Sequence, residues 1–148
     1  MIQKELYIVP KDKLWLENRI AELEKNIQDL GPDFYDVFNQ SSETWHDNAP
    51  FDALRDKQSV LFAELTKLKD IRRQAALSLP KAGRETVAIG STVKVNGKRY
   101  GIAGNWTPRA GQMDDGKLVI SADSPLAQSL LGKMTSTTTP FGILEAIE

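Results

Sequence analysis

The sequence contains no cysteine and a single histidine, His46, among its 148 residues. Without cysteine the chain has neither a disulfide framework nor a thiolate metal site, and one imidazole is too few for a zinc site. A lone histidine beside an aspartate in a polar connection also gives no basis for a Ser–His–Asp triad. These absences argue against disulfide-rich secreted proteins, zinc proteins and serine hydrolases.

Long hydrophobic runs are absent as well. No run approaches the ~20 apolar residues that a membrane-spanning helix needs. The start, MIQKELYIVPKDK, lacks the apolar segment and small-residue cleavage site of a signal peptide. Hydrophobic residues make up 41% of the chain and charged residues 26%, which is typical of a globular protein. We therefore expect a cytoplasmic protein without membrane contact.

An excess of charge of either sign is also missing. The formal net charge is −1. The residues up to Pro80 include 11 basic and 14 acidic side chains, and those after it include 8 and 6. Neither half has the positive charge of a protein that holds nucleic acid mainly by neutralising phosphates.

The N-terminal half carries two apolar seams with alternating spacings of four and three residues, as in a coiled coil. The first seam is Leu16, Ile20, Leu23, Ile27 and Leu30, and the second is Phe51, Leu54, Gln58, Leu61, Leu65 and Leu68. Asp12 is a plausible helix N-cap, and the second helix is predicted over about Pro50–Ala76. Two seams joined by one connection predict an antiparallel helical hairpin. A simple coiled-coil interaction module is the alternative.

The C-terminal half has the two-residue period of strands. STVKVNGKRYGIAG alternates on both sides of Asn96-Gly97, a strong hairpin signal, and KLVISA and FGILEAIE read as further strands. SPLAQSLLGK predicts a short helix with Ser124 as N-cap, Pro125 in the first turn and Gly132 at the end. The fold class is therefore α+β, with a coiled-coil hairpin over residues 1–78 and a small antiparallel sheet with one helix over residues 79–148.

The connection between the seams, SSETWHDNAPFD, is rich in groups that bind metals. Glu43, Asp47 and Asp52 offer oxygen ligands and His46 a nitrogen. Because Mg²⁺ is usually held by one or two protein carboxylates plus phosphate and water, such a tip could complete a metal site on another molecule. The other interpretation is a solvated connection in which Asp47 or Asn48 caps the second helix.

Two C-terminal segments resemble the bacterial Gre-type transcript cleavage factors. ISADSPLAQSLLGK is similar to that family's Ile-Ser-x-x-Ser-Pro segment, and VAIGSTVKV to the opening strand of its C-terminal domain. The resemblance implies an FKBP-like C-terminal fold and binding to RNA polymerase in its secondary channel. It also implies that Asp123, Ser124 and Pro125 dock on the rim of that channel.

At the tip, DNAPF lies where the family has Glu-Asn-Ala-Glu-Tyr, so Asp47 takes the family's glutamate position. The family's aspartate position falls on Thr44, and Glu43 is the neighbouring acid. The resemblance implies an accessory factor, not an enzyme, whose Asp47 and Glu43 help to hold a Mg²⁺ shared with polymerase. The function implied is stimulated cleavage of backtracked RNA, with inhibition of polymerase as the alternative.

The resemblance further implies a monomer that meets the RNA 3′ end and the DNA template only within the elongation complex. A prolyl isomerase or chaperone is a third functional hypothesis, which follows from the FKBP-like fold alone. It needs an apolar aromatic pocket, and the sequence after Trp106 has few aromatic residues.

Overall fold

The computed structural model describes residues 5–41, 49–75 and 85–148. The chain divides into two compact units, which are described separately below. One unit, the hairpin unit, is Leu14–Arg73, and the other, the sheet unit, joins the residues up to Lys13 to those from Gln74 onward. No helix in the described residues combines the length and the hydrophobicity that crossing a membrane requires.

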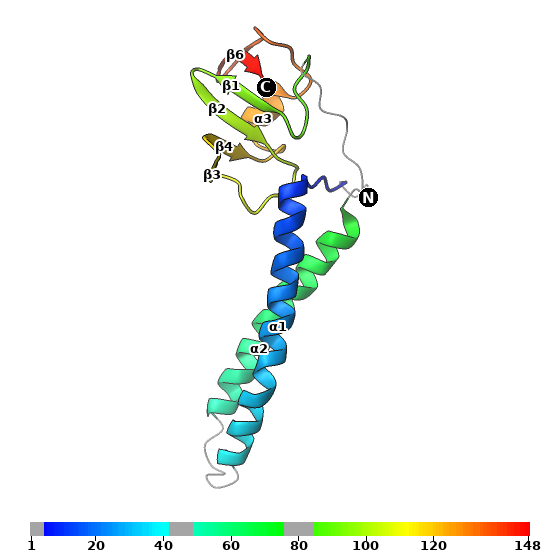
Figure 1. Ribbon diagram of the computed structural model, residues 1–148, viewed down its shortest axis with the longest axis vertical. Coiled ribbons are helices and arrows are strands. Elements are labelled where there is room, and N and C mark those ends of the chain that lie inside the picture. The colour runs from blue at the N-terminus through cyan, green and yellow to red at the C-terminus, as the bar shows by residue number, and fades with distance from the viewer. Residues whose placement is uncertain (1–4, 42–48, 76–84) are drawn as a thin grey trace. The chain divides into compact units, whose positions relative to one another are not determined.

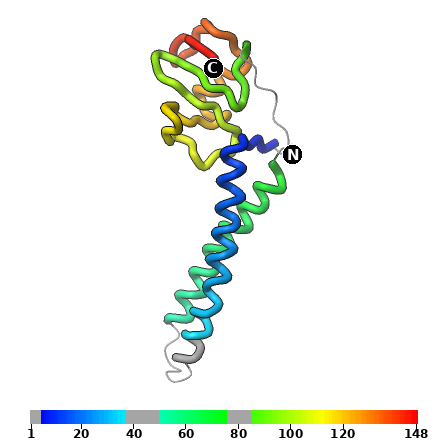
Figure 2. The backbone as a smooth tube through the Cα atoms, viewed as in Figure 1, coloured from blue at the N-terminus to red at the C-terminus, as the bar shows by residue number. Residues whose placement is uncertain are grey.

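The hairpin unit consists of two long helices that run side by side in opposite directions (Figures 1 and 2). Helix α1 is Pro10–Ser41, of 32 residues, and α2 is Ala49–Gln74, of 26 residues. At about 1.5 Å per residue these are roughly 48 and 39 Å long. Both predicted helices are thereby confirmed, and α1 passes through Pro32 without ending.

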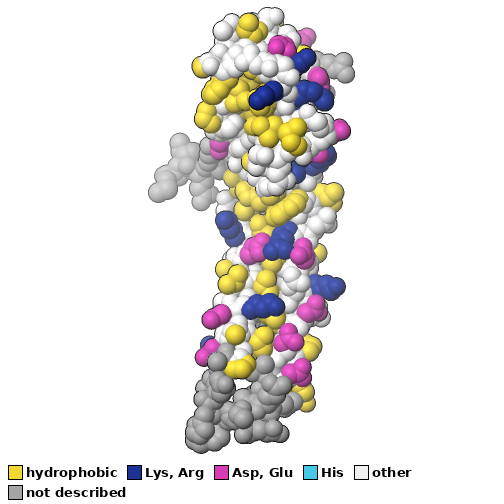
Figure 3. Space-filling model, turned by 90° about the vertical axis from the view of Figure 1, so that its left-hand side faces the viewer, with side chains coloured by type: hydrophobic (Ala, Val, Ile, Leu, Met, Phe, Trp, Pro, Cys, Tyr) yellow, Lys and Arg dark blue, Asp and Glu magenta, His cyan; other side chains and the backbone are white. Residues whose placement is uncertain are grey.

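The two predicted seams form the contact between these helices. The first-seam leucines and isoleucine, Leu16, Ile20, Leu23 and Leu30, are buried, as are Leu65 and Leu68 of the second seam. In Figure 3 the hydrophobic side chains form a stripe along the hairpin, with charged side chains on both sides of it. Burial of this stripe stabilises the pair of helices. Their outer faces are mostly polar but also expose Leu14, Trp15, Tyr35, Val60 and Phe62.

Polar and aromatic contacts fix the register of the hairpin. Arg19 donates through Nε and Nη2 to the two carboxylate oxygens of Glu64, at 2.9 Å each. This hydrogen bond from Arg19 lowers the pKa of the Glu64 carboxyl from its usual value. Near the other end the rings of Phe34 and Phe51 pack edge to face with centroids 5.6 Å apart. The aromatic pair extends the seam beyond Gly31, where the leucine pattern ends.

In its described residues the sheet unit contains six strands and one short helix. The strands are β1 Thr92–Val95, β2 Lys98–Ile102, β3 Met113–Asp114, β4 Lys117–Ile120, β5 Thr138–Thr139 and β6 Gly142–Ile147, in the order β3-β4-β2-β1-β6-β5. Helix α3 is Pro125–Leu130. The α+β class, the helical hairpin and the short helix are as predicted. The core between sheet and α3 contains Val87, Val93, Val95, Ile102, Ala122, Ala127, Leu130 and Leu144.

The sheet is mixed, which corrects the prediction of an antiparallel sheet. Four strand pairs are antiparallel, but β2 and β4 pair in parallel, with Gly101 opposite Val119. Parallel neighbours need a connection that returns the chain to the starting edge. Residues 103–112 make that return before the tight turn at Asp115 and Gly116, where φ is 53° and 77°.

The N-terminus of α1 also differs from the prediction. The helix begins at Pro10, so Asp12 lies in its first turn and is not the N-cap. Proline is favoured at a first helical position because its missing N–H would have no partner there. Residues up to Lys13 belong to the sheet unit by their contacts.

Candidate functional site

The predicted acidic tip lies outside the described residues. Glu43, Thr44, His46 and Asp47 fall between Ser41, where α1 ends, and Ala49, where α2 begins. Their sequence position at the connection of the hairpin is therefore established, while their roles remain predictions. Within the described ranges, no group of three or more His, Asp or Glu side chains could hold a metal ion.

The second predicted site, Asp123–Pro125, is a defined loop at the start of α3. Ser124 has an extended backbone (φ −66°, ψ 152°), and its Oγ accepts a hydrogen bond from the Ala127 N–H at 3.3 Å. The same hydroxyl donates to the Ser121 carbonyl at 2.7 Å. The predicted N-cap and the proline in the first turn are thereby confirmed. Gly132, with φ +79°, follows the end of the helix as predicted.

These contacts give the two polar residues of the loop different roles. The half-buried Ser124 uses its hydroxyl as donor and acceptor within the loop, so it sets the shape of the turn. Asp123 and Pro125 are exposed. The Asp123 N–H donates to Ser121 Oγ at 3.2 Å, which fixes the backbone that carries its carboxylate. The loop therefore presents an acidic side chain and a proline ring on a fixed backbone.

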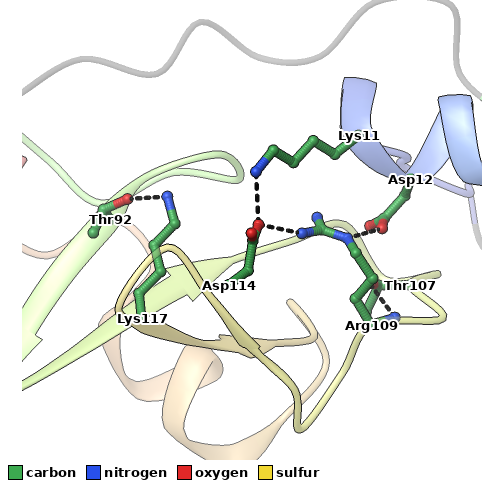
Figure 4. Close-up of polar contacts among 7 residues, drawn as sticks. All are labelled: Lys11, Asp12, Thr92, Thr107, Arg109, Asp114 and Lys117. Atoms are coloured by element: carbon green, nitrogen blue, oxygen red, sulfur yellow. Dashed lines mark hydrogen bonds and ion pairs between the residues drawn. The ribbon is translucent and has the colours of Figure 1, made fainter.

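A second polar cluster lies on the sheet unit, where the start of α1 meets β3 (Figure 4). Asp114 Oδ2 accepts from Lys11 Nζ at 2.7 Å and from Arg109 Nη1 at 2.8 Å. Arg109 Nε donates to Asp12, which is fully buried, at 2.6 Å. The hydrogen bond from Lys11, with the positive charges of Arg109 and Lys117, lowers the pKa of the Asp114 carboxyl. Asp114 is therefore an anion held by two cations at neutral pH.

Next to this cluster the sheet unit has a pocket of about 300 Å³. Its lining comprises Val9, Pro10, Lys11, Gly90, Ser91, Thr92, Gly101, Ile102, Ala103, Arg109, Asp114, Lys117 and Val119. The lining is mainly apolar with a few charged and hydroxyl groups, which is the usual character of a small-molecule site. Sequence reasoning missed this pocket, because its residues come from four separated segments and no local motif marks them.

Tyr100 and Arg109 are an aromatic and a basic residue of the sheet unit, the types that together can stack on bases. Tyr100 packs against the core on the α3 side of the sheet. Arg109 is bonded to Asp12 and Asp114 at the pocket. The structure therefore does not bring Tyr100 and Arg109 together as a surface for stacking bases.

Comparison with known proteins gives structural matches only. No family model matches the chain, and no curated protein matches it. The crystal structure of GreA factor homolog 1 (Gfh1) of Thermus thermophilus is 21% identical, with a TM-score of 0.42, over 98% of this chain and 99% of that chain. A structure of the transcription factor Gfh1 is 22% identical, with a TM-score of 0.46, over 99% of both chains. At TM-scores below 0.5 this likeness assigns no function.

Proposed function

We propose that this chain is a Gre-like transcription factor that binds the secondary channel of RNA polymerase and stimulates cleavage of backtracked RNA. The observation that carries the proposal is the segment ISADSPLAQSLLGK. Its residues resemble the Gre family's docking segment. In this chain they form an exposed acidic loop ahead of a serine-capped helix. A loop with a fixed backbone suits binding, because little conformational entropy is lost on docking.

The hairpin unit supports the same proposal. A helical pair roughly 40 Å long can carry a tip into a narrow channel, and its acidic connection lies at the end of both helices. Asp47 and Glu43 would there offer carboxylate oxygens to a Mg²⁺ held jointly with polymerase. A second metal ion and an oriented water are what phosphodiester hydrolysis at a two-metal site requires. The chain would then be an accessory factor, and the catalytic centre would belong to polymerase.

The second candidate function is occupation of the same channel without cleavage, which would inhibit or tune transcription. One sequence observation favours it: Thr44 stands where the Gre family has one of its two acids. A hydroxyl is a weaker Mg²⁺ ligand than a carboxylate, so the tip would have fewer charges with which to hold the ion. The two candidate functions would share docking and differ in cleavage.

A transcript-cleavage assay tests the proposal and its alternative. Purified backtracked elongation complexes are incubated with the protein and Mg²⁺, and the RNA 3′ ends are sized on a gel. Shortened RNA that resumes elongation is the expected result. Binding to polymerase with slowed synthesis and full-length RNA would favour the inhibitor. A protein that does not bind polymerase would contradict both functions.

The docking loop yields a separate prediction about affinity. Asp123→Ala should weaken binding to polymerase about tenfold, the value of one charged hydrogen bond, while the melting temperature stays unchanged. Ser124→Ala should instead lower the stability of the sheet unit by about 1 kcal/mol, because it removes the N-cap of α3. Affinity is measured by fluorescence anisotropy and stability by thermal unfolding.

Glu85→Ala is the matched control for the docking prediction, since Glu85 is another exposed acid of the sheet unit. Its affinity for polymerase should equal that of the unmodified protein. If Asp123→Ala binds as tightly as Glu85→Ala, the loop does not dock through its carboxylate.

A further inference from the structure

The pocket of the sheet unit lies on the face of the sheet opposite α3. Gly101 pairs with Thr92 of β1 on one side and with Val119 of β4 on the other, so these three residues point to the same face. Their neighbour Ile102 points the other way, into the core against α3. Val9 packs on Val119 at one end of the free face. The open pocket of about 300 Å³ lies over this face and includes Val9 and Val119 in its lining.

Lys117 is held in position over this face. A Cβ on Gly101 would lie 3.2 Å from the Lys117 Cδ, so the absence of a side chain at Gly101 makes room for the lysine stem. The Lys117 Nζ donates to Thr92 Oγ1 at 3.0 Å (Figure 4). The Lys117 side chain is thus held along its methylene stem and at its ammonium group before a ligand binds.

Charge at the pocket is not balanced. Its lining has three cations, Lys11, Arg109 and Lys117, and one carboxylate, Asp114. That carboxylate is bonded to the first two cations, and Arg109 also serves the buried Asp12. Among the lining cations, the one whose bonded partner is a neutral hydroxyl is Lys117. With the buried Asp12 included, the charges at the pocket still have a positive sum, and an anion placed at Lys117 is favoured.

The hydroxyl groups of the lining also favour an anion. Ser91 Oγ accepts from the Ala88 N–H at 3.0 Å, and Thr92 Oγ1 accepts from Lys117. A hydroxyl that accepts one hydrogen bond keeps its own proton to donate. Thr92, which points to the same face as Gly101, and the remaining N–H groups of Lys117 thus act as donors toward the pocket. A ligand group with several acceptor oxygens matches such a set.

We infer that this pocket binds a phosphate monoester that has a small apolar or aromatic body. The phosphate would accept hydrogen bonds from Lys117 and Thr92, since it offers three acceptor oxygens and close to two negative charges at neutral pH. The body of the ligand would lie on the apolar part of the lining, formed by Val9 and Val119. This site is separate from the docking loop and is tested without polymerase.

The test is an NMR titration of the full-length, ¹⁵N-labelled protein with phenyl phosphate. Saturable shifts are expected at the amides of the lining residues Gly90, Gly101 and Ala103. Lys117→Met keeps the stem but removes the charge, and should weaken binding at least tenfold. Lys98→Met makes the same change at an exposed lysine of β2 outside the pocket and should bind as the unmodified protein does.

Ligand controls separate the two parts of the inference. Phenol lacks the phosphate and inorganic phosphate lacks the body, so each should bind at least several-fold more weakly than phenyl phosphate. Thr92→Val removes one donor at nearly constant size and should reduce affinity several-fold, with the amide spectrum elsewhere unchanged. This second variant keeps the test decisive if Lys117→Met disturbs the fold.

Three results would overturn the inference. The first is the absence of saturable shifts at the pocket amides with phenyl phosphate at millimolar concentration. The second is that Lys117→Met, or a folded Thr92→Val variant, binds phenyl phosphate as tightly as the unmodified protein does. The third is equal affinity for phenylacetate, which carries one negative charge, because a carboxylate site would then replace the phosphate site.

Discussion

Replacement of Asp47 with alanine should slow the shortening of backtracked RNA by about tenfold to a hundredfold, with unchanged affinity for polymerase. The reason is the chemistry of Mg²⁺, which relies on only one or two protein carboxylates and loses much of its hold when one is removed. Affinity should persist because docking is proposed to depend on the Asp123 loop. Cleavage rates in single-turnover gels, at saturating protein, measure the effect.

The reverse experiment adds an acid at Thr44. Thr44→Asp should raise the cleavage rate about tenfold, since it places a second carboxylate three residues before Asp47, as in the Gre family pattern. Thr44→Asn is the matched control, similar in size but uncharged, and should leave the rate unchanged. Equal rates for Asp47→Ala and the unmodified protein would contradict a role for Asp47. If Thr44→Asp binds polymerase and still does not cleave, the acidic-tip mechanism is wrong for this chain.

Much of the fold follows from local rules that a sequence shows directly. The seam from Leu16 to Leu30 has the coiled-coil period, and its buried leucines in α1 confirm it. Asn96 and Gly97 both take positive φ, 50° and 75°, as a two-residue hairpin turn requires. Ser124 caps α3 as the SPLAQSLLGK pattern predicts. In each case the determining residues lie within a few positions of one another.

The features that sequence reasoning missed depend on residues far apart along the chain. Arg109 bonds Asp12 across 97 positions, and Lys11 bonds Asp114 across 103. No local pattern indicates such a pair, so the sequence alone favoured Asp12 as a helix N-cap and not as a partner of Arg109. The parallel pairing of β4 was missed for the same reason, since strand direction is set by a return connection and not by strand composition.

The same difference between local and distant residues separates the two candidate sites. The SADSP segment predicted a docking loop, and the structure adds local contacts and exposure. The Ser124 hydroxyl is bonded within the loop, and the Asp123 residue is exposed. The phosphate pocket had no sequence signal, because Lys117 reads as the ordinary polar start of a strand. Its position over Gly101 becomes visible only when β1, β2 and β4 are side by side.

The second large effect is expected at Gly104, where the N-terminal segment crosses the sheet unit. A Cβ at Gly104 would lie 1.7 Å from the Tyr7 carbonyl oxygen, which is backbone and cannot rotate away. The Tyr7 N–H donates to Asn105 Oδ1 at 2.8 Å, and the Asn105 amide donates to the Glu5 carbonyl at 2.7 Å. Gly104→Ala must therefore displace this segment and break both contacts.

We expect Gly104→Ala to lower the free energy of unfolding of the sheet unit by about 2–4 kcal/mol, and its melting temperature by roughly 10 °C or more. Hydrogen exchange should show loss of protection at the Tyr7 amide first, because its acceptor lies beside the new methyl group. Gly101→Ala is the control, since its Cβ would meet only the flexible stem of Lys117 at 3.2 Å. If Gly104→Ala has the same melting temperature as Gly101→Ala and keeps the Tyr7 amide protected, the close backbone approach at Gly104 does not hold the N-terminal segment. A selective loss of amide protection at Tyr7 would instead show that Gly104 allows the N-terminal segment to pack against the sheet, which lies about 90 residues later in the sequence.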